Sequence, residues 1–474
     1  MKDLRQFIQM TEEMGELKTI EGAHWNLEIG AICRLVGAGS DPRALLFDKI
    51  EGYKAGYRIL ANPFCTDKRV ALGLGLTVET SRPELVRKLR DKLNEPLKLI
   101  PPVEVKDAPI LQNVQTGDDV DLFKFPTPKW QARDGGRYIG TGDNVIMKDP
   151  DEGWVNVSTN RVQIHDKSTA TIYFAPGKHG GMIREKYWKR GQSCPVAITC
   201  GSEPLLVVIG SSAIPWGMPE YDYAGWWKKE PLEVIKGPTT GLPIPAHAEI
   251  ALEGEMVPPD VETRIEGPFS EWTGHYSPAK PESAVRIKCV LHRNDPIILG
   301  VLPFLGRGVP YGHTPLVISA QVWNHLDRLV PGVKGVWCPP EFHRNTIVIS
   351  LAQKYGGHAK QAALGALSRY NYSVKYVIVV DDDIDPYNIR EVLFALAFRA
   401  DPEKFDIIRD SWCDGLEPLL SPFKRQTEDI THTAVLITAC KPYAWMKDFP
   451  PAADVNVSQQ LLEQIGRKFK GVLP

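Results

Sequence analysis

The stretch Ile265-Glu-Gly-Pro-Phe-Ser-Glu-Trp-Thr-Gly-His-Tyr276 is the most informative part of this 474-residue chain. A Gly-Pro pair lies between its two carboxylates, Glu266 and Glu271. Because proline is excluded from helix interiors, the stretch is predicted to be a turn or a bent strand. An ideal strand would place residues five apart on opposite faces, whereas a bend at Gly267-Pro268 would bring both carboxylates to one site.

Aromatic residues surround this carboxylate pair: Phe269, Trp272 and Tyr276. Burial against aromatic surface raises the pKa of a carboxyl group, and a positive neighbour lowers it. One glutamate could then donate a proton while the other stays charged. The alternative is a solvated loop with two surface glutamates, because exposed glutamate is common.

The amino-acid composition limits the classes of protein to which this chain can belong. Apolar residues make up 43% of the chain and charged residues 24%, which is typical of globular proteins. A net charge of -2 argues against general nucleic-acid binding. No apolar run is long enough for a membrane span, and Met1 to Gly22 lacks the apolar core of a secretory signal. The eight cysteines form no CxxC pair and predict buried free thiols in a reducing cytoplasm.

The order of expected elements divides the chain into three domains. Residues 1–106 combine amphipathic helices (2–17, 27–35, 83–93) with short strands (44–47, 57–61), which predicts an α/β domain. Residues 107–310 contain short runs broken by turn residues, which predicts an antiparallel barrel or sandwich. Its expected strands are 144–147, 154–164, 170–174, 196–199, 205–209, 249–253 and 284–291, with helices at 182–190 and 221–227.

Residues 311–474 return to an α/β pattern. Its expected helices are 316–329, 388–400 and a last helix after Asp454 as N-cap, and its expected strands are 346–351 and 374–380. The acidic stretch Asp381 to Asp385 is interpreted as a strand end and helix entry, because it lacks the glycine and glutamate of a calcium loop.

Three further segments carry candidate ligands. Asn156 lies on an expected strand, His179 lies among glycines, and Glu220 follows a Gly-Pro-rich segment. An amide, an imidazole and a carboxylate suit Mg²⁺ or Mn²⁺ better than a thiophilic metal. Taken singly, each also has a structural interpretation: an asparagine in a turn, a core histidine, and a glutamate in the first turn of a helix.

Together these motifs resemble those of the UbiD family of prenylated-FMN-dependent decarboxylases. The motifs are Asn156 to Arg161 (Asn-x4-Arg), Lys178-His179, Pro219 to Gly225 (Pro-Glu-Tyr-Asp-Tyr-Ala-Gly), the Glu266 to Glu271 run, and the acidic stretch Asp381 to Pro386. They occur in the family's order over most of the chain. The resemblance implies an α+β fold: an N-terminal α/β domain, a central split β-barrel (flavin-reductase-like) for the cofactor, and a C-terminal α/β domain used in oligomerisation.

The resemblance also implies residue roles. Asn156, His179 and Glu220 would hold Mn²⁺ (or Mg²⁺) that bridges to the phosphate of the prenylated FMN. Ser211 and Ser212 would contact this phosphate or a K⁺ (or Na⁺) ion, and Ser158, Arg161 and Lys178 would complete the cofactor-binding set. Arg161, Glu266 and Glu271 would form the catalytic network, with Glu271 as proton donor and Glu266 as the partner of Arg161.

Such a network has a physical rationale. Loss of CO2 leaves a carbanion, which needs an electron sink that a cofactor supplies. A guanidinium orients carboxylates through paired hydrogen bonds, and a carboxylic acid can return the proton. By resemblance, the substrate is an aromatic, heteroaromatic or α,β-unsaturated carboxylic acid, and the reaction is reversible at high CO2. A flavin prenyltransferase would supply the cofactor, and the chain would form a homodimer or homohexamer.

Two segments depart from the family pattern. Ile430 to Thr433 reads Ile-Thr-His-Thr, where the family often carries a lysine that reaches the cofactor phosphate; Lys424, Arg425 or a backbone site would have to replace it. In the segment 302–315, Arg307 and His313 are candidates for reading a second polar or anionic substrate group, the alternative being an ordinary surface loop.

Two other functions stay open at this point. One is a conventional flavin oxidoreductase on a split barrel. The other is a scaffold or assembly subunit that has lost cofactor binding, an interpretation supported only by the Ile-Thr-His-Thr departure.

Overall fold

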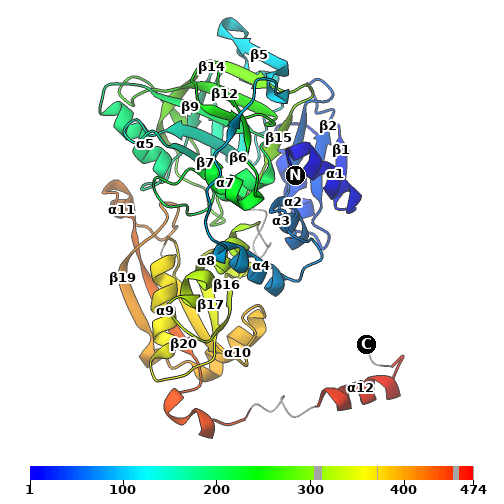
Figure 1. Cartoon of the computed structure of the whole chain (residues 1–474), viewed down its shortest axis with the longest axis vertical. Coiled ribbons are helices and arrows are strands. Elements are labelled where there is room, and N and C mark those ends of the chain that lie inside the picture. Colours follow the sequence, from blue (N-terminus) through cyan, green and yellow to red (C-terminus); the bar gives the residue numbers. More distant parts are fainter. Residues whose placement is uncertain (304–311, 371, 452–457, 473–474) are drawn as a thin grey trace.

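The structure is a computed structural model that describes residues 1–303, 312–370, 372–451 and 458–472. Figure 1 shows a barrel of strands in green, N-terminal elements in blue beside it, and a second sheet in yellow and orange below it. The α+β fold with a central barrel between two α/β parts confirms the expected fold class. The predicted domain boundaries at 106 and 310 stay predictions.

The N-terminal part is a four-stranded sheet with helices around it. Its strand order is β1 (Leu17–Glu21), β2 (Ala44–Asp48), β3 (Arg58–Ala61) and β15 (Ile297–Gly300). Its helices are α1 (Leu4–Glu13), α2 (Glu28–Gly37), α3 (Asp67–Gly73) and α4 (Arg82–Asn94). The predicted helix 2–17 therefore ends early, because Gly15 adopts a positive φ of 67° and Leu17 already belongs to β1.

The central part is a closed antiparallel barrel. Its strands, in order around the barrel, are β12 (Ile250–Met256), β9 (Cys194–Cys200), β6 (Arg137–Lys148), β7 (Val155–Ile164), β8 (Thr169–Ile172) and β14 (Lys280–His292). The barrel closes because β14 pairs with β12 as well as with β8. Apolar side chains of these strands fill the interior, including Val145, Val162, Ile198 and Leu252. Closure removes the exposed sheet edges that an open sheet would leave.

Smaller elements surround the barrel. They are β4 (Val103–Glu104), β5 (Asn113–Thr116), β10 (Glu233–Lys236), β11 (Pro243–Pro245), β13 (Thr263–Glu266), α5 (His179–Trp188) and α7 (Glu220–Lys228). β13 pairs with β14 as a hairpin, so the chain leaves β13 directly into the Gly267-Pro268 segment. Short 3₁₀ helices lie at Pro109–Gln112, Gly117–Asp119, Leu122–Lys124, Pro340–Phe342, Pro402–Lys404 and Tyr443–Asp448.

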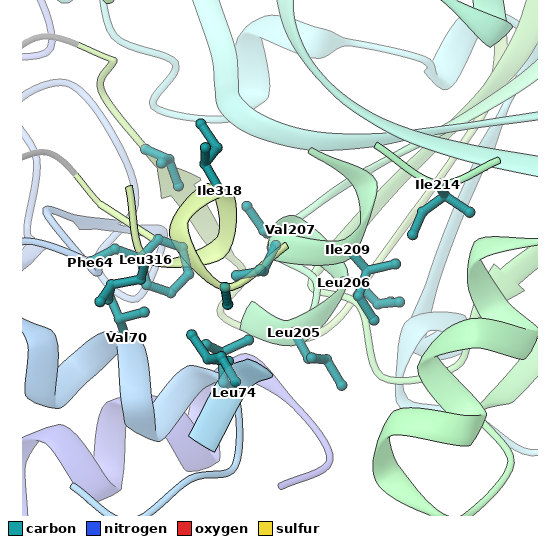
Figure 2. Packing of buried hydrophobic residues seen from close by; sticks show 14 of the residues in the cluster. Phe64, Val70, Leu74, Leu205, Leu206, Val207, Ile209, Ile214, Leu316 and Ile318 are labelled. Atoms are coloured by element: carbon teal, nitrogen blue, oxygen red, sulfur yellow. The ribbon is translucent and has the colours of Figure 1, made fainter. Parts of the chain in front are cut away.

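The predicted strand 205–209 is wrong, because these residues form helix α6 (Pro204–Gly210). Every residue from Pro204 to Ile209 is buried, and a short apolar run has no periodicity that distinguishes a buried strand from a buried helix. Figure 2 shows side chains of α6 in one cluster with Phe64, Val70 and Leu74 of the N-terminal part and Leu316 and Ile318 of α8 (Thr314–Asp327). Helix α6 is thus the place where the three parts of the chain share one core.

The C-terminal part is a mixed five-stranded sheet. Its order is β16 (Val333–Trp337), β17 (Thr346–Leu351), β18 (Tyr376–Asp381), β20 (Thr431–Ala439) and β19 (Asp406–Trp412), and the three middle strands are parallel. Its other helices are α9 (His358–Arg369), α10 (Ile389–Arg399), α11 (Pro422–Gln426) and α12 (Gln459–Lys468). Ser458 caps α12, and Asp454, the predicted N-cap, lies outside the described residues.

The acidic stretch after β18 is a strand end, as expected. Asp381 is the last residue of β18, and Arg399 pairs with both Asp381 and Asp383. Burial raises the pKa of Asp383, but the bonds from Arg399 and Lys441 outweigh it and lower the value to about 2. These carboxylates are neutralised by side chains of the same domain.

The cysteines and the lengths of the helices were also predicted from the sequence. All eight cysteines are free; seven are buried and Cys65 is half-buried. Within the described residues, no helix combines the length and the apolar character needed to cross a bilayer.

Candidate active site

A cavity of about 430 Å³ lies between the barrel and the C-terminal sheet. Barrel residues from β7 and the segments around α5 and α6 form one wall. The opposite wall comes from the C-terminal part and consists of Arg344, Arg369, Tyr370, Tyr372, Trp412 and Leu416. This volume lies within the range of cofactor and small-molecule sites, about 300 to 1,000 Å³.

The structure brings the predicted site residues together around this cavity. It is lined by Asn156, Ser158, Arg161, Lys178, His179, Ser211, Ser212, Glu220 and Glu271. Glu266 lies behind Arg161 and does not line the cavity. His313 lines a second cavity of about 180 Å³, which shares Glu271 and Ser211 with the first. Arg307 lies outside the described residues.

Arg161 on β7 pairs with both Glu266 and Glu271. Its Nε donates to Glu266 Oε1 at 2.7 Å and its Nη2 donates to Glu266 Oε2 at 3.0 Å. Nη1 pairs with Glu271, and Nη2 also donates to Ser277 Oγ at 3.2 Å. The three side chains are all buried, with exposed fractions of 9%, 1% and 6% for Arg161, Glu266 and Glu271. The bend therefore does place both carboxylates on one site.

The local sequence explains this bend. β13 ends at Glu266, and Gly267 then adopts a φ of 80°, a conformation that favours glycine. A Cβ on Gly267 would also come within 2.9 Å of the Pro278 carbonyl oxygen. Ser277 N–H donates to Phe269 O at 2.9 Å, which closes the segment into a compact loop. The solvated-loop interpretation is wrong for both glutamates.

Aromatic rings and hydroxyls complete the surroundings of Arg161. The guanidinium carbon lies 4.9 Å from the centre of the Tyr173 ring and 5.0 Å from that of Phe269. Burial lowers the pKa of Arg161, but the adjacent Glu266 carboxylate outweighs it and keeps the pKa above its usual value. Tyr138 Oη donates to Glu266 Oε1 at 3.4 Å. Glu266 is thus a fixed, fully partnered carboxylate, whereas Glu271 faces the cavity.

The three candidate metal ligands come from three elements. Asn156 is on β7, while His179 and Glu220 are the first residues of α5 and α7. Burial raises the pKa of Glu220 to about 7, opposed by backbone N–H donors such as Val157 N at 2.7 Å. Burial also lowers the pKa of His179, with Lys178 as a second cause. A cation would restore the charge of Glu220, and the neutral imidazole is the form that binds metals.

Asn156, His179 and Glu220 can hold a divalent ion only if the side-chain amide of Asn156 is one of the ligands. Among the described residues, no cluster of three or more His, Cys, Asp and Glu side chains is arranged for a metal. Within the same residues, the buried Nδ2 of Asn156 has no hydrogen-bond partner, so the amide is not committed to a structural network. Metal binding at Asn156, His179 and Glu220 stays a prediction.

The cavity carries more positive than negative charge. In the described part of the chain, neither Lys178 nor Arg369 forms an ion pair with a carboxylate. Burial lowers the pKa of both side chains, and Lys178 Nζ lies 4.6 Å from the centre of the Tyr372 ring. Two cations that line the cavity without carboxylate partners favour an anionic ligand.

Sequence reasoning missed the C-terminal wall. Arg369 ends helix α9 and Arg344 precedes β17, and no local motif marks either residue as part of a site. The expected replacements for the family lysine lie elsewhere: Lys424 Nζ donates to Thr431, and the Arg425 guanidinium donates to backbone carbonyls including Gly415 O at 2.7 Å. Neither side chain lines the cavity.

His313 is buried, which excludes the surface-loop interpretation for this residue. Its Nε2 lies 2.7 Å from Ser211 Oγ, and burial lowers its pKa to about 4. The neutral ring therefore lines the second cavity, which Glu271 and Trp272 also line.

Models of three carboxy-lyase domains match successive parts of the chain. The N-terminal, Rift-related and C-terminal domains of 3-octaprenyl-4-hydroxybenzoate carboxy-lyase match residues 8–93, 102–305 and 314–439. Together they span most of the sequence in the expected order.

Characterised relatives include decarboxylases of aromatic acids. Pyrrole-2-carboxylic acid decarboxylase from Pseudomonas aeruginosa is 33% identical over 84% of this chain and 83% of its own. A phenolic acid decarboxylase from Sedimentibacter hydroxybenzoicus is 32% identical over 93% of this chain and 92% of its own.

Solved structures of related enzymes have a similar fold over nearly the whole chain. The vanillic acid decarboxylase of Sedimentibacter hydroxybenzoicus in closed form superposes with a TM-score of 0.83 at 29% identity, covering 99% of both chains. The UbiD-class enzyme HmfF from Pelotomaculum thermopropionicum, in complex with FMN, superposes with a TM-score of 0.81 at 26% identity, covering 97% of this chain and 98% of HmfF.

Proposed function

The chain belongs to the UbiD family of carboxy-lyases, and from this premise we propose that it is a reversible, non-oxidative decarboxylase that uses prenylated FMN. Its proposed substrate is an aromatic, heteroaromatic or α,β-unsaturated carboxylic acid. The observation that carries the proposal is the Arg161 guanidinium, bound by two buried carboxylates at the wall of a cofactor-sized cavity.

The cavity residues support a phosphate-bearing cofactor. When bound, prenylated FMN supplies the electron sink that decarboxylation requires. We assign Lys178 and Arg369 as the cations that contact its phosphate, because they lack carboxylate partners in the described part of the chain. The hydroxyls of Ser158, Ser211 and Ser212 line the same cavity and suit phosphate or a K⁺ (or Na⁺) ion.

The metal assignment rests on donor chemistry. Asn156, His179 and Glu220 would hold Mn²⁺ (or Mg²⁺) with an amide oxygen, an imidazole nitrogen and a carboxylate. The raised pKa of Glu220 supports this assignment, since a nearby cation stabilises the ionised form.

The catalytic roles follow from the asymmetry of the two glutamates. Glu266 fixes the Arg161 guanidinium from behind through two bonds. Arg161 in turn holds Glu271 at the cavity surface. After the bond to CO2 breaks, the electron pair left on carbon takes the proton of the Glu271 carboxylic acid, and Glu271 then regains a proton from solvent. In the reverse direction the Glu271 carboxylate removes the proton.

Cofactor loading and CO2 release test this function together. The chain would be produced in cells that express a flavin prenyltransferase and receive manganese, then analysed by native mass spectrometry and absorbance. We expect a bound prenylated FMN and CO2 release from at least one aromatic, heteroaromatic or acrylic acid. Nicotinamide oxidation without CO2 release would indicate a conventional flavin oxidoreductase, and a colourless protein would indicate a scaffold. Light scattering on the loaded protein would test the proposed homodimer or homohexamer.

A further inference from the structure

Trp272, the residue after Glu271, is held by two side chains of the C-terminal part. Its indole Nε1 donates to Asp414 Oδ2 at 3.2 Å, and the Arg344 guanidinium carbon lies 4.0 Å from the ring centre. Arg344 Nη2 pairs with the same Asp414 oxygen at 3.3 Å. The three side chains therefore form a triangle, which we call the Trp272 clamp, across the boundary between the barrel and the C-terminal sheet.

Asp414 is held in a single orientation. It is 2% exposed, and its other oxygen, Oδ1, accepts a hydrogen bond from Leu416 N at 3.1 Å. A buried carboxylate is stable only when its oxygens keep charged or hydrogen-bonding partners. Rotation away from Trp272 would leave the buried indole N–H without its carboxylate partner. The contact is thus directional, unlike ordinary apolar packing.

The clamp acts one residue away from the proposed proton donor. Glu271 N donates to His275 O at 3.0 Å and Gly274 N donates to Glu271 O at 2.9 Å, so the backbone of this segment is a tight turn. Within such a turn, fixing the indole also fixes the direction in which the Glu271 side chain leaves the backbone. Glu271 and Trp272 line both cavities, at the place where the two meet.

We propose that Asp414 is a positioning residue for Glu271. Through Trp272 it couples the seating of the C-terminal sheet on the barrel to the orientation of the Glu271 carboxyl group. Asp414 itself lines neither cavity, so any effect on Glu271 passes through neighbouring side chains such as Trp272. The proposal rests on the proposed function, because it assigns Asp414 a part in the same proton transfer. A displacement of about 1 Å in such a group costs about 100-fold in rate.

Two substitutions in the cofactor-loaded enzyme separate the parts of the clamp. Trp272→Phe keeps a ring beneath Arg344 and removes the indole N–H, whereas Asp414→Asn keeps the shape and removes the charge. We expect each to lower kcat by about 10- to 100-fold, a larger change than in KM or in FMN affinity. The solvent deuterium isotope effect on kcat should rise, because the misplaced acid slows proton transfer. The double variant should lose no more than the larger single loss.

A matched control is available in the same segment. Glu417 is also 2% exposed, and its carboxylate pairs with Lys375 at 2.8 Å. Its backbone N–H donates to Asp414 O at 2.9 Å, a bond that a side-chain change keeps. Glu417→Gln therefore removes a comparable buried ion pair, and it should leave the isotope effect at its wild-type value. Wild-type kcat and isotope effect in both clamp variants would overturn the proposal. If Asp414→Asn does not fold, Trp272→Phe decides the question by itself.

Hydrogen–deuterium exchange tests the coupling without turnover. Backbone exchange in residues 267–276 should increase in Trp272→Phe and Asp414→Asn and stay unchanged in Glu417→Gln. Unchanged exchange in the clamp variants would overturn the coupling. Absence of CO2 release from the loaded wild-type enzyme would instead count against the proposed function, so the two failures are distinguishable.

Discussion

Arg161 and Glu266 form a two-pronged ion pair, with bonds of 2.7 Å and 3.0 Å, in which Glu266 is 1% exposed. Such a pair fixes the plane of the guanidinium, so that Nη1 points to Glu271. We expect Glu266→Gln to lower decarboxylation by at least about 100-fold. Breaking a buried ion pair should also destabilise the fold by about 3 kcal/mol. Steady-state rates of CO2 release and chemical denaturation would measure both effects.

Glu282 is the control for this change. It is 5% exposed, lies on the strand that pairs with β13, and bonds Lys280 at 2.8 Å and Arg184 at 3.3 Å. Glu282→Gln should destabilise the barrel and keep the activity per folded molecule. Equal activity losses in the two variants would contradict a specific role for Glu266.

Glu271→Gln tests the proton donor. The amide keeps the size of the side chain and one acceptor for Arg161, but it has no acidic proton to give. We expect product formation to fall by about 100- to 10,000-fold while the cofactor stays bound, as absorbance and native mass spectrometry would show. Glu271→Asp retains an acid on a shorter chain and should keep part of the activity. Full turnover in Glu271→Gln would remove Glu271 from this role.

Arg369→Gln tests the phosphate contact on the C-terminal wall. A charge-assisted hydrogen bond is worth about 1.5 to 3 kcal/mol, so FMN should bind about 10- to 100-fold more weakly. Riboflavin, which lacks the phosphate, should bind with unchanged affinity; fluorescence titration would measure both ligands. Lys424→Gln should behave as wild type because Lys424 bonds Thr431 away from the cavity. Equal weakening of FMN and riboflavin would contradict a phosphate contact.

Local pattern was sufficient for most of the fold. Alternating strands and amphipathic helices carry their own periodicity, and β17 spans the predicted residues 346–351. Helix α6 was not predictable in this way, because all its apolar residues are buried on every side. What decides its conformation is the shared core in Figure 2, to which distant parts of the chain contribute.

In the candidate site, too, some residues could be predicted from the local sequence and others could not. The turn at Gly267 could be inferred from the Gly-Pro pair, whereas the meeting of Glu266 and Glu271 was one of two interpretations that the spacing allowed. Arg344, Arg369 and Asp414 could not be inferred, because they reach the site from elements more than 70 residues away in sequence that carry no motif of their own. Only the seating of the C-terminal sheet on the barrel brings these side chains to the cavity and to Trp272.

Asp134 makes the free energy of unfolding depend on pH. It is 3% exposed, and its carboxylate accepts hydrogen bonds from Gln131 N at 2.8 Å and from Ser270 N at 3.2 Å. Burial raises its pKa to about 6, opposed by these two N–H donors. The folded protein therefore holds this proton up to about pH 6, whereas the unfolded chain releases it near pH 3.8. Because the folded state binds more protons in this window, the free energy of unfolding falls as pH rises.

The full effect is about 3 kcal/mol, since each pKa unit corresponds to about 1.4 kcal/mol, and about 2.4 kcal/mol of it falls between pH 4 and pH 7. Asp134→Asn has no titrating group and should lack this component. Urea denaturation of both proteins at several pH values would give the difference, which should shift in favour of the variant as pH rises. Asp41→Asn is the control, because that side chain is 66% exposed. A difference between wild type and Asp134→Asn that does not change with pH would show that Asp134 keeps an ordinary pKa in the folded protein.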